Sequence, residues 1–228
     1  MSPGRRLRDA VAHHWRRLLG ALLMLVVAVG VVSSDQLHAA VTGIYAEAVH
    51  IIVVRPVVGT VLFVLLAAVS AMVAFFSSAV LVPAGVLAWG TPVTFLLLWA
   101  GWLLGGVIAY GIGRRYGRRV VLWLVREESM QRYERRIANN APFAAVLLLQ
   151  MALPSEVPGY LVGLLRYPFA RYLLALALAE LPFALGAVLL GESFVEGDVL
   201  RLVALGLAGI VLSASAVMAW HRRNGRGR

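Results

Sequence analysis

A proline-flanked acid inside a long apolar stretch most strongly constrains how this chain folds. Pro154 and Pro158 interrupt the apolar run 141–190, and Glu156 lies between them. Each proline removes a backbone donor and clashes with the preceding helical turn, so an ordinary helix does not continue through both. At membrane depth, a broken helix and an ionisable side chain are tolerated only where protein or water surrounds them. The stretch 154–158 is therefore the first candidate for a functional site.

The composition indicates a membrane protein built from helices. Of the 228 residues, 61% are hydrophobic and 14% are charged, whereas about a quarter of the residues in a soluble domain carry charge. The apolar residues gather in long runs, as in a polytopic membrane protein. The net charge of +10 comes from arginines, because the chain has no lysine. These arginines flank the apolar runs, as the positive-inside rule describes, so we do not expect nucleic acid as a partner.

Several classes of chemistry find no support in the sequence. The chain has no cysteine, which excludes disulfides, thiolate chemistry and cysteine metal sites. The 5 histidines are scattered without the spacing of metal ligands. The glycines at 111–117 follow an apolar span instead of a strand and have the wrong spacing for a dinucleotide loop. No nucleophile is paired with a base, so we expect no enzyme, no metal and no cofactor.

Four apolar runs are interpreted as full membrane spans, and two further runs are interrupted. The full spans are 18–32, 93–112, 169–190 and 199–220, and the interrupted runs are 56–89 and 141–167. As one helix, 56–89 would far exceed a hydrocarbon core of about 30 Å, so two arms that meet near Ser77 and return to the same side fit better. The first span could also be a cleaved signal peptide with a weak cleavage site at Ala39 and Ala40. Its long basic leader favours an uncleaved helix.

The distribution of charge sets the expected topology. With a cytoplasmic N-terminus, the two interrupted runs enter from opposite faces, and four full crossings bring the C-terminus back to the cytoplasm. Arg55 and Arg201 then lie outside, which leaves 19 of the 21 arginines inside. This asymmetry predicts a multi-pass protein of the cell (inner or plasma) membrane. The expected parts are 1–55 with the first span and outer loop, 56–191 with both interrupted runs, and 192–228 with the last span and basic tail.

A shift of 78 residues aligns the two interrupted runs and the spans that follow them. It places Ser77 on Ser155, Gly85 on Gly163, Trp89 on Tyr167 and Gly113 on Gly191. Each unit reads as a break, a small-residue turn, an aromatic edge, a proline and a full span. Because the units enter from opposite faces, this order favours an inverted repeat with two re-entrant helical hairpins. Chance matching of glycines in apolar sequence is the alternative.

The stretch 105–117, Gly-Gly-Val-Ile-Ala-Tyr-Gly-Ile-Gly-Arg-Arg-Tyr-Gly, resembles the signature of the DedA family. This family is also called the VTT-domain or SNARE-associated Golgi protein family, and the resemblance extends over 70–191 with the stretches 77–90 and 154–168. It implies two re-entrant hairpins and a role in moving lipids across the bilayer. The lipids implied are undecaprenyl phosphate in bacterial members and phospholipids in eukaryotic members, with proton coupling through membrane acids.

This chain departs from the pattern of bacterial members at several positions. Gly106 stands four residues before the signature Tyr110, where an acid is usual. Ser77 and Ser78 occupy the first hairpin, where a glutamate is common. Gln150 lies beside the position at which many members carry an arginine before the second hairpin.

Candidate site residues fall into three groups, each with an alternative interpretation. The proposed substrate or proton path comprises Pro154, Ser155, Glu156, Pro158, Ser77, Ser78, Gln150 and Glu180. Either acid could carry a proton, because burial suits that task; Glu156 could instead cap a half-helix, and Glu180 could pair with a polar neighbour. The proposed lipid head-group residues are Arg114, Arg115, Arg166 and Arg171, which could equally be ordinary cytoplasmic flanking residues. The proposed helix-packing residues are Gly105, Gly106, Tyr110, Gly113 and Gly163.

We therefore expect an all-α polytopic membrane protein with about four full transmembrane helices and the function of a lipid transporter, like a flippase or scramblase. Membrane lipids are the expected partners, and a homo-oligomer is compatible with the sequence. The alternatives are a transporter of a small ion or solute, and a membrane scaffold that binds partners or anionic lipids through the charged segment 113–140. That segment reads either as an interfacial helix or as a solvated loop.

Overall fold

The computed structural model describes residues 22–23, 25–73, 81–116, 142–153 and 156–225, and all the regular secondary structure in these ranges is helical. Residues 25–32 are helical. The labelled helices that follow are α2 (Asp35–Val54), α3 (Pro56–Met72), α4 (Val82–Tyr116), α7 (Phe143–Ala152), α8 (Glu156–Leu164), α9 (Phe169–Glu196) and α10 (Val199–Gly225). The expectation of an all-α protein is confirmed for the described residues.

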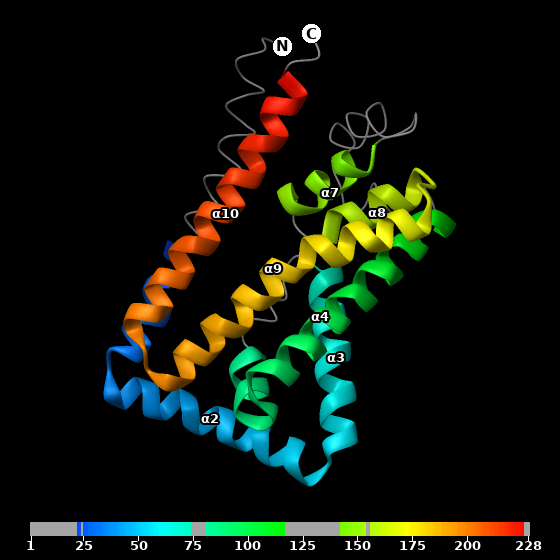
Figure 1. Ribbon diagram of the computed structural model, residues 1–228. Helices are drawn as coiled ribbons and strands as arrows, with labels where there is room; N and C mark the ends of the chain where they lie inside the picture. The colour runs from blue at the N-terminus through cyan, green and yellow to red at the C-terminus, as the bar shows by residue number, and fades with distance from the viewer. Residues whose placement is uncertain (1–21, 24, 74–80, 117–141, 154–155, 226–228) are drawn as a thin grey trace.

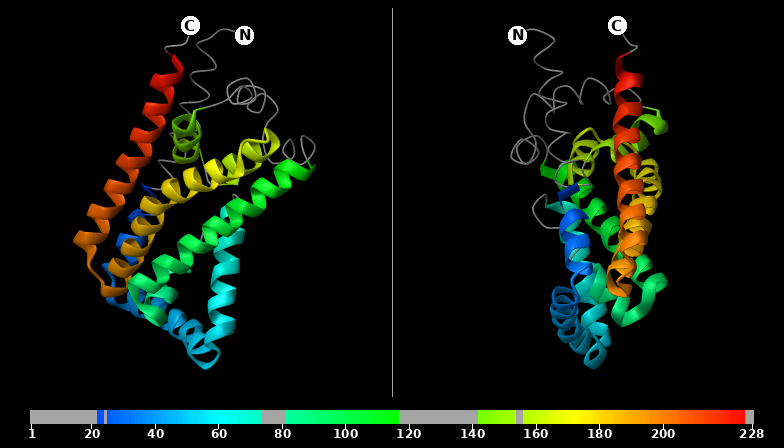
Figure 2. Two further views of the ribbon diagram at one scale, coloured as in Figure 1. Left: turned by 45° about the vertical axis from the view of Figure 1, so that its right-hand side comes forward. Right: turned by 90° about the vertical axis from the view of Figure 1, so that its left-hand side faces the viewer.

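Helices α4 and α9 form the centre of the molecule and pack against each other along their length (Figure 1). Helix α10 lies on the outer side of α9, and α2 lies across the lower end (Figure 2). Helix α3 rises from that lower end beside α4, whereas α7 and α8 lie toward the opposite end. The interrupted runs therefore occupy opposite ends of the central helix pair.

Helix α4 bends sharply at Gly90. This residue has φ 77° and ψ 168°, a conformation that glycine alone adopts readily. Pro92 follows in the first turn of the second piece, where the missing N–H has no acceptor within the helix. The bend separates a short arm, residues 82–89, from a long helix, residues 91–116. The sequence marks this break, because Gly90 and Pro92 stand between the interrupted run 56–89 and the span expected at 93–112, which lies within the long piece.

The described part of the first interrupted run consists of two separate helices. Helix α3 begins with Pro56 and ends at Met72, and Val73 is extended with φ −124° and ψ 119°. Helix resumes at Val82. The expected tip at Ser77 lies outside the described residues.

The second interrupted run breaks earlier and more briefly than expected. Helix α7 ends at Ala152, Leu153 is extended with φ −107° and ψ 155°, and α8 begins at Glu156. Pro158 was expected to belong to the break, and this expectation is wrong, because Pro158 is the third residue of α8. A proline is tolerated in the first helical turn, since that N–H has no partner within the helix.

Apolar side chains form exposed stripes along the outside of the helices. On α3 the exposed residues include Val57, Val61, Leu65 and Val69, and on α9 they include Leu174, Leu178, Leu181 and Leu185. Contiguous apolar surface of this extent is unusual for a monomer in water and suits contact with lipid. Among the described helices, α4 and α9 are long and apolar enough to cross a membrane. The segment 33–55, for which an outer loop and no helix was expected, contains helix α2.

Candidate functional site

Much of the expected substrate path lies outside the described residues. This applies to Pro154 and Ser155 at the second break and to Ser77 and Ser78 at the first. Glu156 is the first residue of α8, but its side chain is outside the described part. The site hypothesis for these residues therefore stays a prediction. The described site consists of the side chains that surround the second break.

Glu180 lies on the buried face of α9. Its side chain is 6% exposed, and its neighbours on this face include Leu176, Ala179 and Ala184. Helices α4, α7 and α10 pack against α9. The acid therefore faces other protein elements instead of lipid. An intramembrane acid placed in this way is a candidate for a functional role.

Two buried polar groups near the second break lack partners among the described residues. Gln150 is the third residue from the end of α7 and is 6% exposed, yet its Nε2 donates no hydrogen bond. The hydroxyl of Tyr167, which lies between α8 and α9, also has none. Leaving a buried polar group unsatisfied costs about 1–3 kcal/mol, so each such group suggests an ion, a water or a ligand at the site. Both groups belong to the second interrupted run, which supports a polar path there.

Three tyrosines join elements distant in the sequence through hydrogen bonds to backbone oxygens. The Tyr110 hydroxyl donates to the Tyr167 carbonyl oxygen at 2.6 Å, and the Tyr172 hydroxyl donates to the Gly106 carbonyl oxygen at 2.8 Å. The rings of Tyr110 and Tyr172 are stacked with centroids 4.9 Å apart. On α8, the Tyr160 hydroxyl reaches the Met72 carbonyl oxygen at 3.4 Å. Tyr160 and Tyr172 were not among the site residues expected from the sequence. The available signal for each was a tyrosine within an apolar run.

The expected packing residues lie where helices meet at backbone distance. A Cβ atom on Gly113 would lie 2.2 Å from the carbonyl oxygen of Tyr160, and one on Gly163 would lie 2.2 Å from that of Tyr110. Helices α4 and α8 are thus in mutual backbone contact. Gly105 makes a similar approach to the backbone of α3, and Gly106 lies against the side chain of Leu176 on α9.

Four exposed arginines lie at the end of the molecule where α4 stops and α9 begins. Arg114 and Arg115 form the last turn of α4, and Arg171 is in the first turn of α9. Arg166, between α8 and α9, has a left-handed backbone with φ 53°. The rings of Tyr110 and Phe169, whose centroids are 5.3 Å apart, connect the two helix ends. The structure therefore brings the expected head-group residues to one end, and Arg114 Nη1 also donates to the Tyr110 hydroxyl at 2.9 Å.

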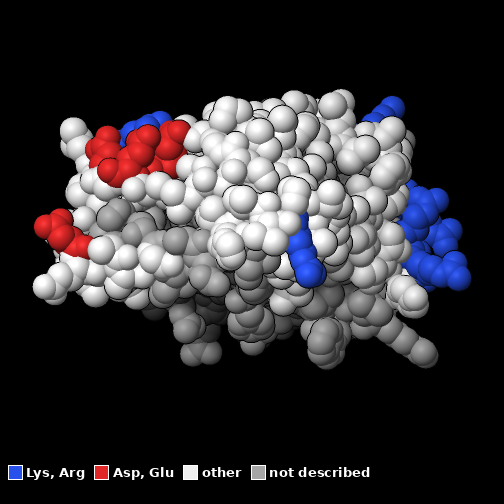
Figure 3. Space-filling view, turned by 90° about the horizontal axis from the view of Figure 1, so that it is seen from below, with Lys and Arg blue, Asp and Glu red and all other residues white. Residues whose placement is uncertain are grey.

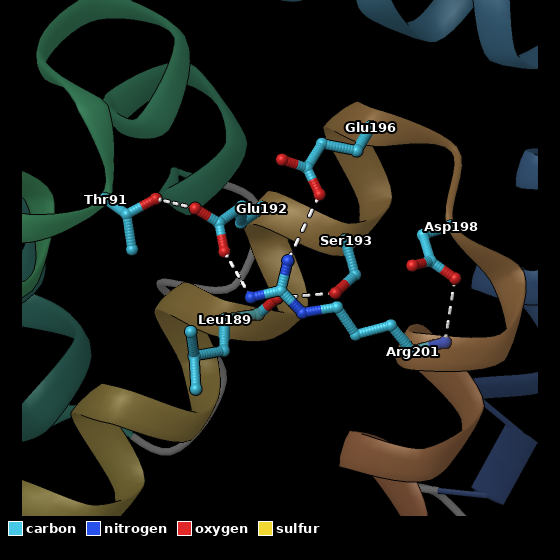
Figure 4. A network of polar contacts seen from close by, with 7 residues as sticks. All are labelled: Thr91, Leu189, Glu192, Ser193, Glu196, Asp198 and Arg201. Atoms are coloured by element: carbon cyan, nitrogen blue, oxygen red, sulfur yellow. Dashed lines mark hydrogen bonds and ion pairs between the residues drawn. The ribbon is translucent and has the colours of Figure 1, made fainter.

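Acidic residues gather at the other end of α9. Figure 3, seen from below, shows basic side chains at one edge and acidic side chains at the opposite edge. Glu192, Glu196 and Asp198 surround Arg201, and Thr91 completes this network (Figure 4). In the sequence, the signal was the group of acids at 192–198, between the expected spans 169–190 and 199–220 and shortly before Arg201. Among the described residues, no group of histidines and acids could hold a metal ion.

The all-helical architecture, the lipid-suited apolar stripes and the buried polar groups together define a helical membrane protein. The family model of the VTT domain matches residues 75–193, more than half of the chain. The chain therefore belongs to this family, the DedA or SNARE-associated Golgi protein family, and the resemblance in its sequence is confirmed. The match extends from just after α3 to the last turn of α9. Comparisons with curated proteins and with solved structures found no match.

Proposed function

We propose that this protein moves lipids across the membrane as a flippase or scramblase. Membership of the VTT family, whose match runs from just after α3 to the last turn of α9, carries the proposal. The described polar groups support it, because Gln150 and Glu180 are buried between helices instead of facing lipid. A lipid head group needs such a polar path, while its acyl chains stay in the surrounding hydrocarbon. Undecaprenyl phosphate and phospholipids are the substrates to test.

The proposal includes an inverted repeat with two re-entrant hairpins. A shift of 78 residues carries the Gly90 bend onto Pro168, and the helix that follows, 91–116, onto 169–194 of α9. The same shift of 78 carries one contact between the units onto another. Gly113 of α4 lies against Tyr160 of α8, and its counterpart Gly191 of α9 lies against Val82 of α4. Each short arm thus packs against the far end of the other unit's long helix. Such an exchange is expected of two units related by a two-fold axis in the membrane plane.

Contacts near the centre support the same symmetry. Trp99 Nε1 donates to the carbonyl oxygen of Ala177 at 3.2 Å, and these two residues are related by the same shift of 78. A residue that lies beside its own counterpart is close to the symmetry axis. In this arrangement the protein crosses the cell membrane four times, and both termini are cytoplasmic, as the positive-inside rule favours.

The arginine end supplies the proposed site of head-group capture. Arg114, Arg166 and Arg171 are exposed there, and the guanidinium fork suits the oxygens of a phosphate. The Tyr110 hydroxyl orients Arg114. The polar path toward the interior would begin at this end and continue past Gln150.

The proposal is tested by measuring lipid translocation in proteoliposomes. A fluorescent lipid in the inner leaflet becomes accessible to dithionite only when it is moved outward. We expect Glu156→Gln and Glu180→Gln to slow translocation without loss of folding, and Asp35→Asn, an exposed acid of α2, to serve as the matched control. Measuring lipid translocation with and without a pH gradient tests whether it is coupled to proton movement.

Three outcomes would overturn the proposal or redirect it. Unchanged translocation in both acid variants would remove the role of these acids. Solute flux without lipid movement would indicate a solute transporter. Loss of function on neutralising the arginines of 113–140, with both acids dispensable, would indicate a scaffold.

A further inference from the structure

A polar network at the acidic end joins α4 to α9 and α10, which lie about a hundred residues further along the chain. The Thr91 hydroxyl donates to Glu192 Oε1, and Arg201 Nη2 donates to Glu192 Oε2 at 2.6 Å. Thr91 directly follows the Gly90 bend, Glu192 lies near the end of α9, and Arg201 is in the first turn of α10. Glu192 therefore holds α4 and α10 together through its two oxygens (Figure 4).

Arg201 is itself held in place by neighbouring acids. Its backbone N–H donates to Asp198 Oδ1 at 2.9 Å, which is the geometry of an N-cap at the start of α10. Its Nη1 donates to Glu196 Oε2 at 3.2 Å. The Glu192 side chain is 20% exposed, so its ion pair is less screened than a surface pair. These contacts fix the guanidinium where it can bind Glu192.

The network lies beside the contact between the short arm, residues 82–89, and α9. Val82 at the start of the arm is buried and lies against Gly191, the residue before Glu192. Thr94, one turn after Thr91, is completely buried and donates to the Gly90 carbonyl oxygen at 2.8 Å. The arm joins the long helix through Gly90, around which no atom lies within 4 Å of a Cβ position. The bend can therefore act as a hinge once the network is released.

The two ends of the molecule differ at corresponding positions. The shift of 78 that relates the units carries Arg114 onto Glu192. Arg114 binds the neutral Tyr110 hydroxyl of its own helix, whereas Glu192 binds residues of two other helices. The ion pairs of Arg201 with Glu192 and Glu196 lie at the acidic end, where they join α9 to α10 by charge.

We propose that Thr91, Glu192 and Arg201 form a latch that holds the Gly90 bend, and with it the adjoining end of the short arm, against α9, and that lipid passage requires this latch to open. The link to transport rests on the proposed function. Opening of the latch itself can be measured without any transport, so the two ideas can fail separately.

The first test uses a buried cysteine as a reporter of opening. The natural chain has no cysteine, so Thr94→Cys introduces the only thiol, at a completely buried position. In purified protein, Arg201→Gln should raise the rate of its reaction with a small water-soluble thiol reagent about fivefold, which corresponds to about 1 kcal/mol. Glu192→Gln should act in the same direction, since it removes the same ion pair. Arg55→Gln, at an exposed arginine before α3, should leave the rate unchanged.

Equal labelling rates in Arg201→Gln, Glu192→Gln and the parent would overturn the latch. An equal rise of the labelling rate in Arg55→Gln would also overturn the latch, because loss of any positive charge would then be enough to expose the introduced thiol.

The second test locks the arm with a disulfide. An ideal Cβ on Gly191 lies 3.3 Å from the Cβ of Val82, close to the separation of about 3.5–4.5 Å in disulfides. The double variant Val82→Cys, Gly191→Cys should oxidise readily and then lose at least about tenfold in lipid translocation, and a reductant should restore it. Each single-cysteine variant should be insensitive to oxidant and reductant.

Failure of the pair to oxidise would contradict the closed arrangement, and unchanged translocation by the oxidised protein would contradict the requirement for opening. If neither the natural protein nor its reduced variants move lipid, the proposed function fails, and the labelling of Thr94→Cys alone decides whether the latch exists.

Discussion

Replacing Gly113 or Gly163 by alanine should force α4 and α8 apart. A Cβ atom would lie 2.2 Å from the carbonyl oxygen of Tyr160 in the first variant and of Tyr110 in the second. Ordinary contact begins near 3.4 Å, so the helices must separate by about 1 Å. Because both obstacles are backbone atoms, no change of side-chain rotamer relieves the clash.

The expected loss of stability follows from this geometry. Overpacking in a well-packed core costs about 1–3 kcal/mol. The upper part of this range applies here, since separation of the helices also weakens the packing of Tyr110 in the core cluster around it. For a chain of this size, about 3 kcal/mol corresponds to a fall in Tm of roughly 6–12 °C.

Thermal unfolding in detergent, followed by the intrinsic fluorescence of the 6 tryptophans, measures this loss. The matched control is Gly111→Ala, which lies on the same helix between the two contacts of α4 with α8 and has no atom within 4 Å of its Cβ position. We expect the control to melt at or slightly above the Tm of the natural protein, because alanine favours helix over glycine. If Gly113→Ala and Gly163→Ala both melt with the control, the close backbone contact between α4 and α8 does not exist.

Four further substitutions test three separate features with the same thermal assay. Gly90→Ala should destabilise by about 1–3 kcal/mol, because alanine is strained at φ 77°, and equal melting of Gly90→Ala and Gly111→Ala would refute that bend. Tyr172→Phe removes a buried hydrogen bond of 2.8 Å and should cost about 1 kcal/mol; Tyr160→Phe, whose bond measures 3.4 Å, should cost less, and the reverse order would contradict both geometries. Gln150→Leu should melt no lower than the natural protein, because the buried Nε2 has no described partner, yet it should slow lipid translocation; a clear loss of stability would show that the amide is satisfied in the folded protein.

The breaks in the helices could be predicted from sequence because they depend on local chemistry. Gly90 and Pro92 together terminate a helix whatever surrounds them, and the run around Pro154 likewise excludes a continuous helix. The rule that a proline interrupts a helix gave the wrong prediction at Pro158. A proline disrupts a helix interior but is tolerated in a first turn, and the sequence did not show where α8 begins.

The network at Glu192 could not be predicted in the same way. Thr91 and Glu192 are separated by 101 residues, and their contact exists only because the Gly90 bend meets the far end of α9. The local sequence pattern indicated that the acids at 192–198 lie near the surface, but it did not indicate which residues they contact. The hydrogen bond between Tyr110 and the Tyr167 backbone, across 57 residues, is a second case. Such pairs depend on how the two units pack, which periodicity along one helix does not specify.

The two ends of the proposed inverted repeat differ in a way that favours one state of the protein. Two identical units in opposite orientation would give both ends the same freedom to open. Here the positions that correspond under the shift of 78 carry Arg114 at one end and Glu192 at the other. At the first end, close backbone packing through Gly113 and Gly163 and a hydrogen bond from Tyr160 hold α8, whereas at the second end Glu192 forms an ion pair between α9 and α10. A packing contact constrains an arm's position, whereas an ion pair adds a free-energy term that a single substitution can remove. If both proposals hold, the resting protein presents its arginine end to head groups first, and the acidic end opens only after the latch has been released.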